Sequence, residues 1–126
     1  MNKVILVGNV GADPKTFDFS NGGKMASFPL ATSRRYKDKE GNILEQTAWH
    51  RIQFTADKVD TVARLVKKGS LVHVDGAIRY DTFTDKEGNE VSRTVIHGTA
   101  FNILAFPKRK DGEEEAAPED EEAGGN

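Results

Sequence analysis

The chain has 126 residues, of which 37% are hydrophobic and 30% charged, a size and composition typical of one small domain. It has no cysteine, which excludes disulfides and thiolate metal sites and is typical of cytoplasmic proteins. No apolar run is long enough for a transmembrane helix, and the N-terminus lacks the cleavage site of a signal peptide. We therefore expect a cytoplasmic protein without a membrane partner.

Charge is distributed unevenly along the chain, although the net charge is only −2. Residues 1–110 contain all 18 Lys and Arg but only 12 of the 20 acidic residues, which gives this part a net charge of +6. The other eight acidic residues lie within residues 111–126. Such asymmetry predicts a polyanionic partner for the basic part of the chain.

The first half of the chain predicts three strands followed by a helix. The strands span residues 3–10, 24–33 and 46–55, which are rich in β-branched and aromatic side chains and are separated by turns that contain Gly and Asn. The helix is predicted over residues 57–68, where Val and Leu recur at helical spacing. Gly69 can take the left-handed position that follows a helix end.

The second half predicts two further strands, over residues 70–83 and 91–106. Three strands, a helix and two strands indicate an all-β fold, a five-stranded OB-fold barrel with one helix between strands three and four. Other small β-barrels share this periodicity. From residue 108 onward acids, Ala and Gly dominate, so we expect a domain over residues 1–107 and a disordered acidic tail over residues 108–126.

One five-residue segment occurs twice in the chain. The sequence Asp-Lys-Glu-Gly-Asn that starts at Asp38 recurs unchanged from Asp85. Two hairpins with the same polar tip explain the repeat, and chance recurrence of favourable turn residues explains it equally well. A small Mg²⁺-dependent hydrolase that uses the acidic residues of one tip is the alternative from a different functional class.

Trp49 and Arg51 are the clearest candidates for a binding surface. Alternation along residues 47–55 places them on the face opposite to Ala48, His50, Ile52 and Phe54, which form the better core face. An exposed Trp needs a partner to cover it. Either a ligand covers Trp49, or a loop or a second subunit does.

Flat rings and cations together favour single-stranded nucleic acid as this ligand, because a duplex hides its base faces. The candidate stacking rings are Trp49, Tyr36 and Phe83, and the candidate phosphate-binding side chains are Arg34, Arg35, Lys37, Arg51 and Arg79. The three histidines show no metal-ligand spacing, and no catalytic or cofactor motif is present, so we expect no enzyme, no metal and no cofactor. An RNA-binding or primosomal accessory protein on the same barrel is the alternative binding function.

Several motifs in one register resemble the bacterial single-stranded DNA-binding protein family, the homotetrameric OB-fold type. They lie at residues 1–14, 21–23, 30–33, 45–51 and 67–70, and the resemblance covers about residues 1–105. It implies sequence-tolerant binding and protection of single-stranded DNA during replication, recombination and repair, in the nucleoid. It also places Trp49, Tyr36 and Phe83 at the stacking positions of the family, and His50 at a subunit contact.

The chain departs from the family pattern in three respects. Tyr36 and Phe83 stand where the family often has Trp, and Thr55 stands where many members have a further stacking Phe. The tail has the acids of the family, but it ends in Ala-Gly-Gly-Asn without the apolar tip that docks onto partner enzymes. The resemblance therefore does not extend to tail-mediated protein partners.

Overall fold

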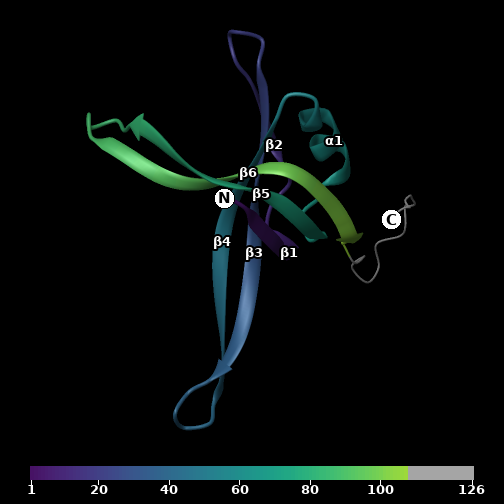
Figure 1. Ribbon diagram of the computed structural model, residues 1–126, viewed down its shortest axis with the longest axis vertical. Coiled ribbons are helices and arrows are strands. Elements are labelled where there is room, and N and C mark those ends of the chain that lie inside the picture. The colour runs from purple at the N-terminus through teal and green to yellow at the C-terminus, as the bar shows by residue number, and fades with distance from the viewer. Residues whose placement is uncertain (108–126) are drawn as a thin grey trace.

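The computed structural model describes residues 1–107, so the tail expected over residues 108–126 lies outside the described residues. The elements follow the chain as strands β1 (Val4–Val10), β2 (Lys15–Asp18), β3 (Lys24–Lys37) and β4 (Ile43–Thr55), helix α1 (Lys58–Leu65), and strands β5 (Leu71–Thr84) and β6 (Glu90–Ala105). Figure 1 shows a central barrel from which three hairpins project. Residues 1–107 contain no helix that is long and apolar enough to cross a membrane.

The strands form one sheet that closes on itself. Their order is β1-β5-β6-β4-β3-β2, and β1 also pairs with β3 through Asn9–Ala31 and Val10–Leu30. Only β4 and β6 pair in parallel, and the other pairings are antiparallel. Five strands therefore make a closed barrel with one helix between β4 and β5, which confirms the predicted OB-fold architecture.

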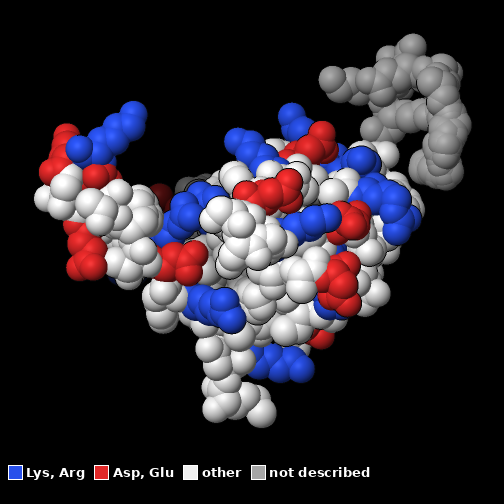
Figure 2. Space-filling model, turned by 90° about the horizontal axis from the view of Figure 1, so that it is seen from above, with Lys and Arg blue, Asp and Glu red and all other residues white. Residues whose placement is uncertain are grey.

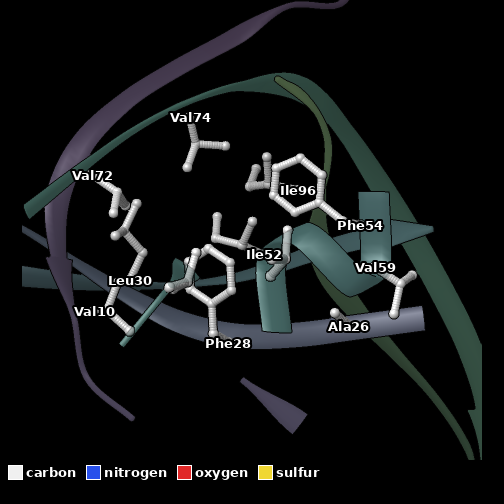
Figure 3. Close-up of a cluster of buried hydrophobic side chains, with 12 residues drawn as sticks. Val10, Ala26, Phe28, Leu30, Ile52, Phe54, Val59, Val72, Val74 and Ile96 are labelled. Atoms are coloured by element: carbon white, nitrogen blue, oxygen red, sulfur yellow. The ribbon is translucent and has the colours of Figure 1, made fainter. Parts of the chain in front are cut away.

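The interior of the barrel is filled by aliphatic side chains around two Phe rings (Figure 3). Phe28 of β3 and Phe54 of β4 stack with their ring centroids 6.4 Å apart. Helix α1 adds Val59 and Val62 to this core. Each fully buried side chain of this size contributes about 1.5–3 kcal/mol of transfer free energy.

The predicted core face of β4 is only partly correct. Ile52 and Phe54 are fully buried as predicted, but Ala48 is exposed and Gln53 is buried. Ala48 lies beyond the barrel, where β3 and β4 continue as a two-stranded arm, and Gln53 is covered because it pairs with β6. Alternation predicts which side a residue faces, but it does not reveal where a strand leaves the barrel.

Several element bounds differ from the predicted ones. Strand β2 was not predicted, because its four residues are all exposed and show no alternation of burial. β3 extends to Lys37 and β4 begins at Ile43, since polar residues of an exposed arm carry no apolar pattern. Helix α1 ends at Leu65, and the positive φ of Gly69 belongs to a turn closed by Ser70 N–H and the Lys67 carbonyl.

The repeated segment forms two hairpin tips with the same hydrogen bonds, as the hairpin interpretation predicted. Asp38 Oδ1 accepts hydrogen bonds from the backbone N–H groups of Glu40 and Asn42, at 2.9 and 2.8 Å. Asp85 Oδ1 accepts the equivalent bonds, at 3.0 and 2.9 Å. These carboxylates cap turns. No cluster of three or more potential metal ligands occurs in the part of the chain that the structure describes.

Closure of the barrel depends on Gly8. A Cβ atom at this position would lie 2.1 Å from the carbonyl oxygen of Ala31 and 2.9 Å from its carbonyl carbon. The obstacle is backbone, so it cannot rotate away as a side chain could. β1 therefore approaches β3 only because residue 8 has no side chain.

We predict that Gly8→Ala lowers the free energy of unfolding by about 1–3 kcal/mol, the cost typical of overpacking. Asn9→Ala is the matched control, because Asn9 is the next residue of β1 and is exposed. Thermal or urea unfolding of both variants measures the difference. Equal stability of the two variants would contradict the steric account of closure.

A second prediction concerns the tip at Asp38. The hydrogen bond from the Asn42 backbone is the main cause that holds the pKa of Asp38 below its ordinary value of 3.8. A lowered pKa means that the stabilising contribution is present above pH 3.8 and is lost as the pH falls through the pKa of the folded state. The amide proton shifts of Glu40 and Asn42 should therefore titrate below pH 3.8, and Asp38→Ala should abolish this titration. A midpoint above pH 3.8 would contradict the capping role.

A candidate nucleic-acid interface

Trp49 is exposed on the outside of the barrel, as the alternation of β4 predicted. Its side chain keeps 63% of its surface in solvent. A Cβ atom on Gly11 would lie 2.5 Å from Cζ3 and 2.9 Å from Cη2 of the indole. The ring therefore rests against the β1–β2 loop at a position where no side chain intervenes, while the rest of its surface is open.

A groove with a volume of about 480 Å³ begins at Trp49. Its lining comes from four strands and the β1–β2 loop: Ala12, Asp13, Lys15, Phe17, Ser27, Phe28, Pro29, Trp49, His50, Arg51, Arg93 and Thr94. The registers explain why these strands share a surface, because residues paired across strands point to the same side of a sheet. Lys15 pairs with Ser27 and Pro29 pairs with Arg51, so the face runs unbroken from β2 to β4.

The same face continues onto β6. Gln53 of β4 pairs with His97 of β6. Trp49 and Arg93 each lie four residues before this pair, so both side chains point to the side of the groove. Arg93 thus lines the same groove as Trp49 through a parallel pairing of strands that are far apart in the sequence.

The groove has more cations than its carboxylates can neutralise. Lys15, Arg51 and Arg93 line it, with Asp13 as the one acidic residue. Asp13 Oδ1 already accepts a hydrogen bond from the backbone N–H of Lys68, at 2.8 Å. Within residues 1–107 the ion pairs shorter than 4.0 Å are Lys24–Asp60 and His73–Asp75, so none involves the cations of the groove.

On the face of the molecule that is seen from above, basic and acidic side chains are mixed. In the view from above, Lys and Arg are dispersed between Asp and Glu, and the β5–β6 arm at the left carries both signs (Figure 2). The capacity of the groove for anions therefore comes from unpaired cations at one place, not from a large patch of one sign. The direct surroundings of Trp49 determine what binds there.

Phe83 is connected to the groove through Arg93. Phe83 lies on the β5–β6 arm with 43% of its surface exposed, and Arg93 Cζ is 5.2 Å from its ring centroid. Arg79 lies on the same side of β5, four residues nearer the barrel. Burial and, second, the charge of Arg79 lower the pKa of His97 below its ordinary value of 6.5. Trp49, Arg51, Arg79 and Phe83 therefore share one face.

Tyr36 and Arg34 lie on the other side of the β3–β4 arm. Trp49 pairs with Ala31, and Tyr36 is an odd number of residues further along β3, so its side chain points away from the groove side. Arg34 Cζ is 4.9 Å from the Tyr36 ring centroid. Arg35 and Lys37 have the parity of Ala31 and point to the side of Trp49. The structure thus brings together only part of the predicted set.

His50 and Thr55 border the groove face. His50 is half-buried, and its Nε2 lies 2.8 Å from Thr32 Oγ1, within hydrogen-bond range. Thr55 is exposed and pairs with Met25, which in turn pairs with Phe17 of β2. The groove side of the sheet therefore has an aromatic ring at Phe17, which lies two strands away from Thr55.

Sequence reasoning missed Gly11, Lys15, Phe17 and Arg93. Lys15 and Phe17 precede the turn at residues 21–23 with alternate spacing, which could have indicated a short edge strand. Pairing the two strands around the tip at residues 85–89 predicts that Arg93 lies opposite Asp81, but it does not predict that Arg93 reaches the groove. The contact of Gly11 with Trp49 has no signal in the sequence, because it depends on how the barrel closes.

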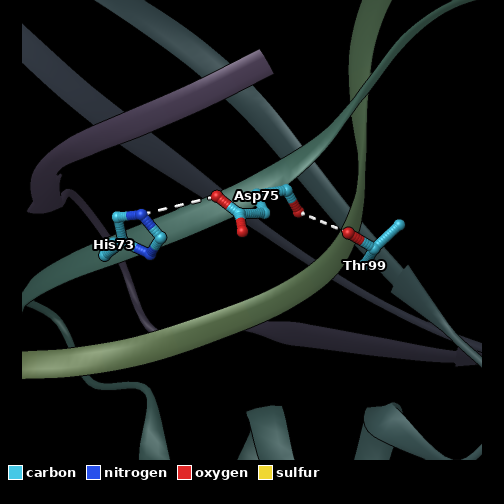
Figure 4. Close-up of polar contacts among 3 residues, drawn as sticks. All are labelled: His73, Asp75 and Thr99. Atoms are coloured by element: carbon cyan, nitrogen blue, oxygen red, sulfur yellow. Dashed lines mark hydrogen bonds and ion pairs between the residues drawn. The ribbon is translucent and has the colours of Figure 1, made fainter. Parts of the chain in front are cut away.

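The opposite face of the barrel, formed by β1, β5 and β6, is different in character. Ile5 and Val7 of β1 are exposed and pair with Asp75 and His73 of β5. His73 Nε2 lies 3.4 Å from Asp75 Oδ1, and Thr99 Oγ1 donates a hydrogen bond to the Asp75 carbonyl, at 3.2 Å (Figure 4). This face has exposed aliphatic side chains and none of the cations of the groove.

Comparisons with known proteins agree with this geometry. A single-stranded DNA-binding protein of Xylella fastidiosa is 39% identical over 112 residues, which cover 89% of this chain and 67% of the relative. One of Xanthomonas campestris is 40% identical over 104 residues, which cover 82% of this chain but only 60% of the relative. The chain thus spans less than two thirds of some relatives that it matches.

Solved structures share the fold. The Plasmodium falciparum SSB, in complex with ssDNA, superposes with a TM-score of 0.75 at 27% identity, over 82% of this chain and 95% of that one. A deletion mutant of the single-stranded DNA binding protein from Thermus aquaticus gives a TM-score of 0.72 at 22% identity, over 82% of this chain and 50% of that one, and shows the fold alone. The model of the single-strand binding protein family matches residues 1–104. The chain belongs to the single-strand binding protein family.

Proposed function

We propose that the protein binds single-stranded DNA along the face that runs from β2 across Trp49 to the β5–β6 arm. The observation that carries the proposal is an exposed indole beside cations that have no carboxylate partner within residues 1–107. Family membership and relatives named for binding single-stranded DNA support the same ligand. Residues 1–107 form the binding domain in this proposal.

The chemistry of the face suits an unpaired strand of any sequence. Every nucleobase has a π-face, so stacking on Trp49 and Phe83 contributes about 1–3 kcal/mol per base without reading the sequence. Arg51 and Arg79 neutralise phosphates on the same side and release counterions. A duplex would keep its base faces covered, and the rings of this face would then have nothing to stack on.

The β3–β4 arm extends the proposed path in two directions. Arg35 and Lys37 continue the cationic side beyond Trp49, toward the tip of the arm. Tyr36 and Arg34 form a cation–ring pair on the other side. Tyr36 therefore stacks a base only where the strand passes around the arm. The proposed path is longer than the groove and uses both sides of this hairpin.

We also propose that the protein assembles as a homotetramer in the cytoplasm, associated with DNA of the nucleoid during replication, recombination and repair. Ile5 and Val7, exposed beside the His73–Asp75 pair, give the β1–β5–β6 face the aliphatic surface that a subunit contact requires. His50, bonded to Thr32 at the groove rim, is the residue we assign to a subunit contact near the DNA.

We predict that Trp49→Ala weakens binding of oligo-dT by about 1–3 kcal/mol, because one base loses its stacking surface. Phe106→Ala is the matched control, since Phe106 is 54% exposed and does not line the groove. Anisotropy of a labelled oligonucleotide measures both affinities, and circular dichroism verifies the fold.

Equal affinities of the two variants would refute the role of Trp49. Competition with RNA and with duplex DNA of equal length tests the ligand itself. Preference for RNA would favour the RNA-binding alternative, and equal binding of duplex DNA would mean that bases are not unstacked on this face.

A further inference from the structure

We propose that Phe17 is a further stacking ring, which binds an unpaired base at the β2 end of the groove while Lys15 contacts the adjoining phosphate. The proposal rests on the proposed function and extends it to a strand that sequence reasoning did not find. It assigns the groove a second base position, distinct from the one at Trp49.

Phe17 is exposed without a structural reason. Strand β2 has four residues, all exposed, and it lies at the edge of the sheet where it pairs only with β3. The Phe17 ring keeps 44% of its surface in solvent and is not part of the core cluster. The part of the ring that remains open to solvent is available to a ligand.

The register directs Phe17 and Lys15 to the groove side. Lys15 pairs with Ser27 and Phe17 pairs with Met25, whereas Thr16 pairs with Ala26, which is fully buried. Paired residues point to the same side of a sheet, so Thr16 faces the core side, and Lys15 and Phe17 face outward. Both outward residues line the groove together with Trp49.

The two rings take different bases. The residue of β4 that lies across Met25 from Phe17 is Thr55, which is well separated from Trp49 along the same strand. Phe17 and Trp49 therefore stand toward opposite ends of the groove, with Arg51 between them along β4. A volume of about 480 Å³ falls within the range of about 300–1,000 Å³ that ligand pockets occupy.

Charge complementarity identifies the occupant. Lys15 follows the same side of β2 as Phe17, and it has no ion pair within the described residues. A flat ring and an unpaired ammonium group two residues apart match one nucleotide, with its base on the ring and its phosphate on the cation. An apolar peptide would fit the ring but would leave Lys15, Arg51 and Arg93 without partners.

The test compares Phe17→Leu with Phe17→Tyr in the full chain. Leu keeps an apolar side chain but has no π-face, whereas Tyr keeps the ring. We expect Phe17→Leu to weaken binding of long oligo-dT by about 5- to 150-fold, which corresponds to stacking of one base. Phe17→Tyr and the control Phe106→Leu should bind within twofold of the unmodified chain.

The length of the DNA separates this proposal from the proposed function. An oligonucleotide too short to reach from Trp49 to Phe17 should bind Phe17→Leu and the unmodified chain equally, and a longer one should not. Quenching of the single Trp should persist in Phe17→Leu at saturating DNA, because Trp49 still stacks its base. If DNA did not quench the Trp fluorescence of the unmodified chain, the proposed function would be refuted.

Unchanged affinity of Phe17→Leu for long DNA would overturn the proposal while the binding at Trp49 stands. Dissociation of an oligomer by Phe17→Leu, measured by native mass spectrometry, would overturn it as well, since the ring would then be a subunit contact. Lys15→Gln supplies an independent readout: the slope of log K against log salt should fall by about 0.7. An unchanged slope would remove the phosphate contact from the proposal.

Discussion

The pairing of the end of β1 with β3 is the constraint on which the rest of the structure depends. It closes the barrel at Asn9 and Val10, and Gly8 permits the close approach of the two backbones. The chain then continues directly into Gly11, whose N–H donates to the Pro29 carbonyl at 3.0 Å. Barrel closure therefore fixes the loop against which Trp49 rests, so the core and the binding face are consequences of one contact.

The closed barrel separates two surfaces with different chemistry. On the groove side, unpaired cations surround exposed rings, and their number exceeds that of nearby carboxylates. On the β1–β5–β6 side, aliphatic residues are exposed instead, beside a half-buried His–Asp pair. A strand of DNA can follow the first surface while copies of the chain contact each other through the second. The two proposed interactions therefore use different residues except at His50, which lines the groove and is also assigned to a subunit contact.

How much the sequence predicts depends on whether a residue lies within the barrel. Alternation placed Ile52, Phe54, Trp49 and Arg51 correctly, because in the barrel one side of β4 is core and the other is solvent. On the arms both sides are solvent, so composition carries no signal for the side on which Tyr36 lies. A local sequence pattern therefore predicts a strand, and the side on which each residue lies, only where one side of the strand is buried.

Contacts between distant strands were beyond any local pattern. Arg93 reaches the groove through the parallel pairing of β4 with β6, which no turn between them indicates. Phe17 was missed because an edge strand of four exposed residues has no apolar periodicity. The exposure of β2 explains both findings. It removes the apolar pattern that would predict the strand, and it leaves the Phe17 ring open to a ligand. Functional residues on exposed edge strands are therefore identified from the structure and not from the sequence.

Fluorescence of Trp49 during titration with oligo-dT tests the central claim most directly, since it is the only Trp of the chain. At low salt the emission should be quenched in proportion to the bound fraction, because a base stacks on the open indole. Raising the salt concentration should reverse the quenching as counterions return to the phosphates. Unchanged emission, at concentrations where a labelled strand is bound, would contradict the account, because DNA would then bind away from this ring.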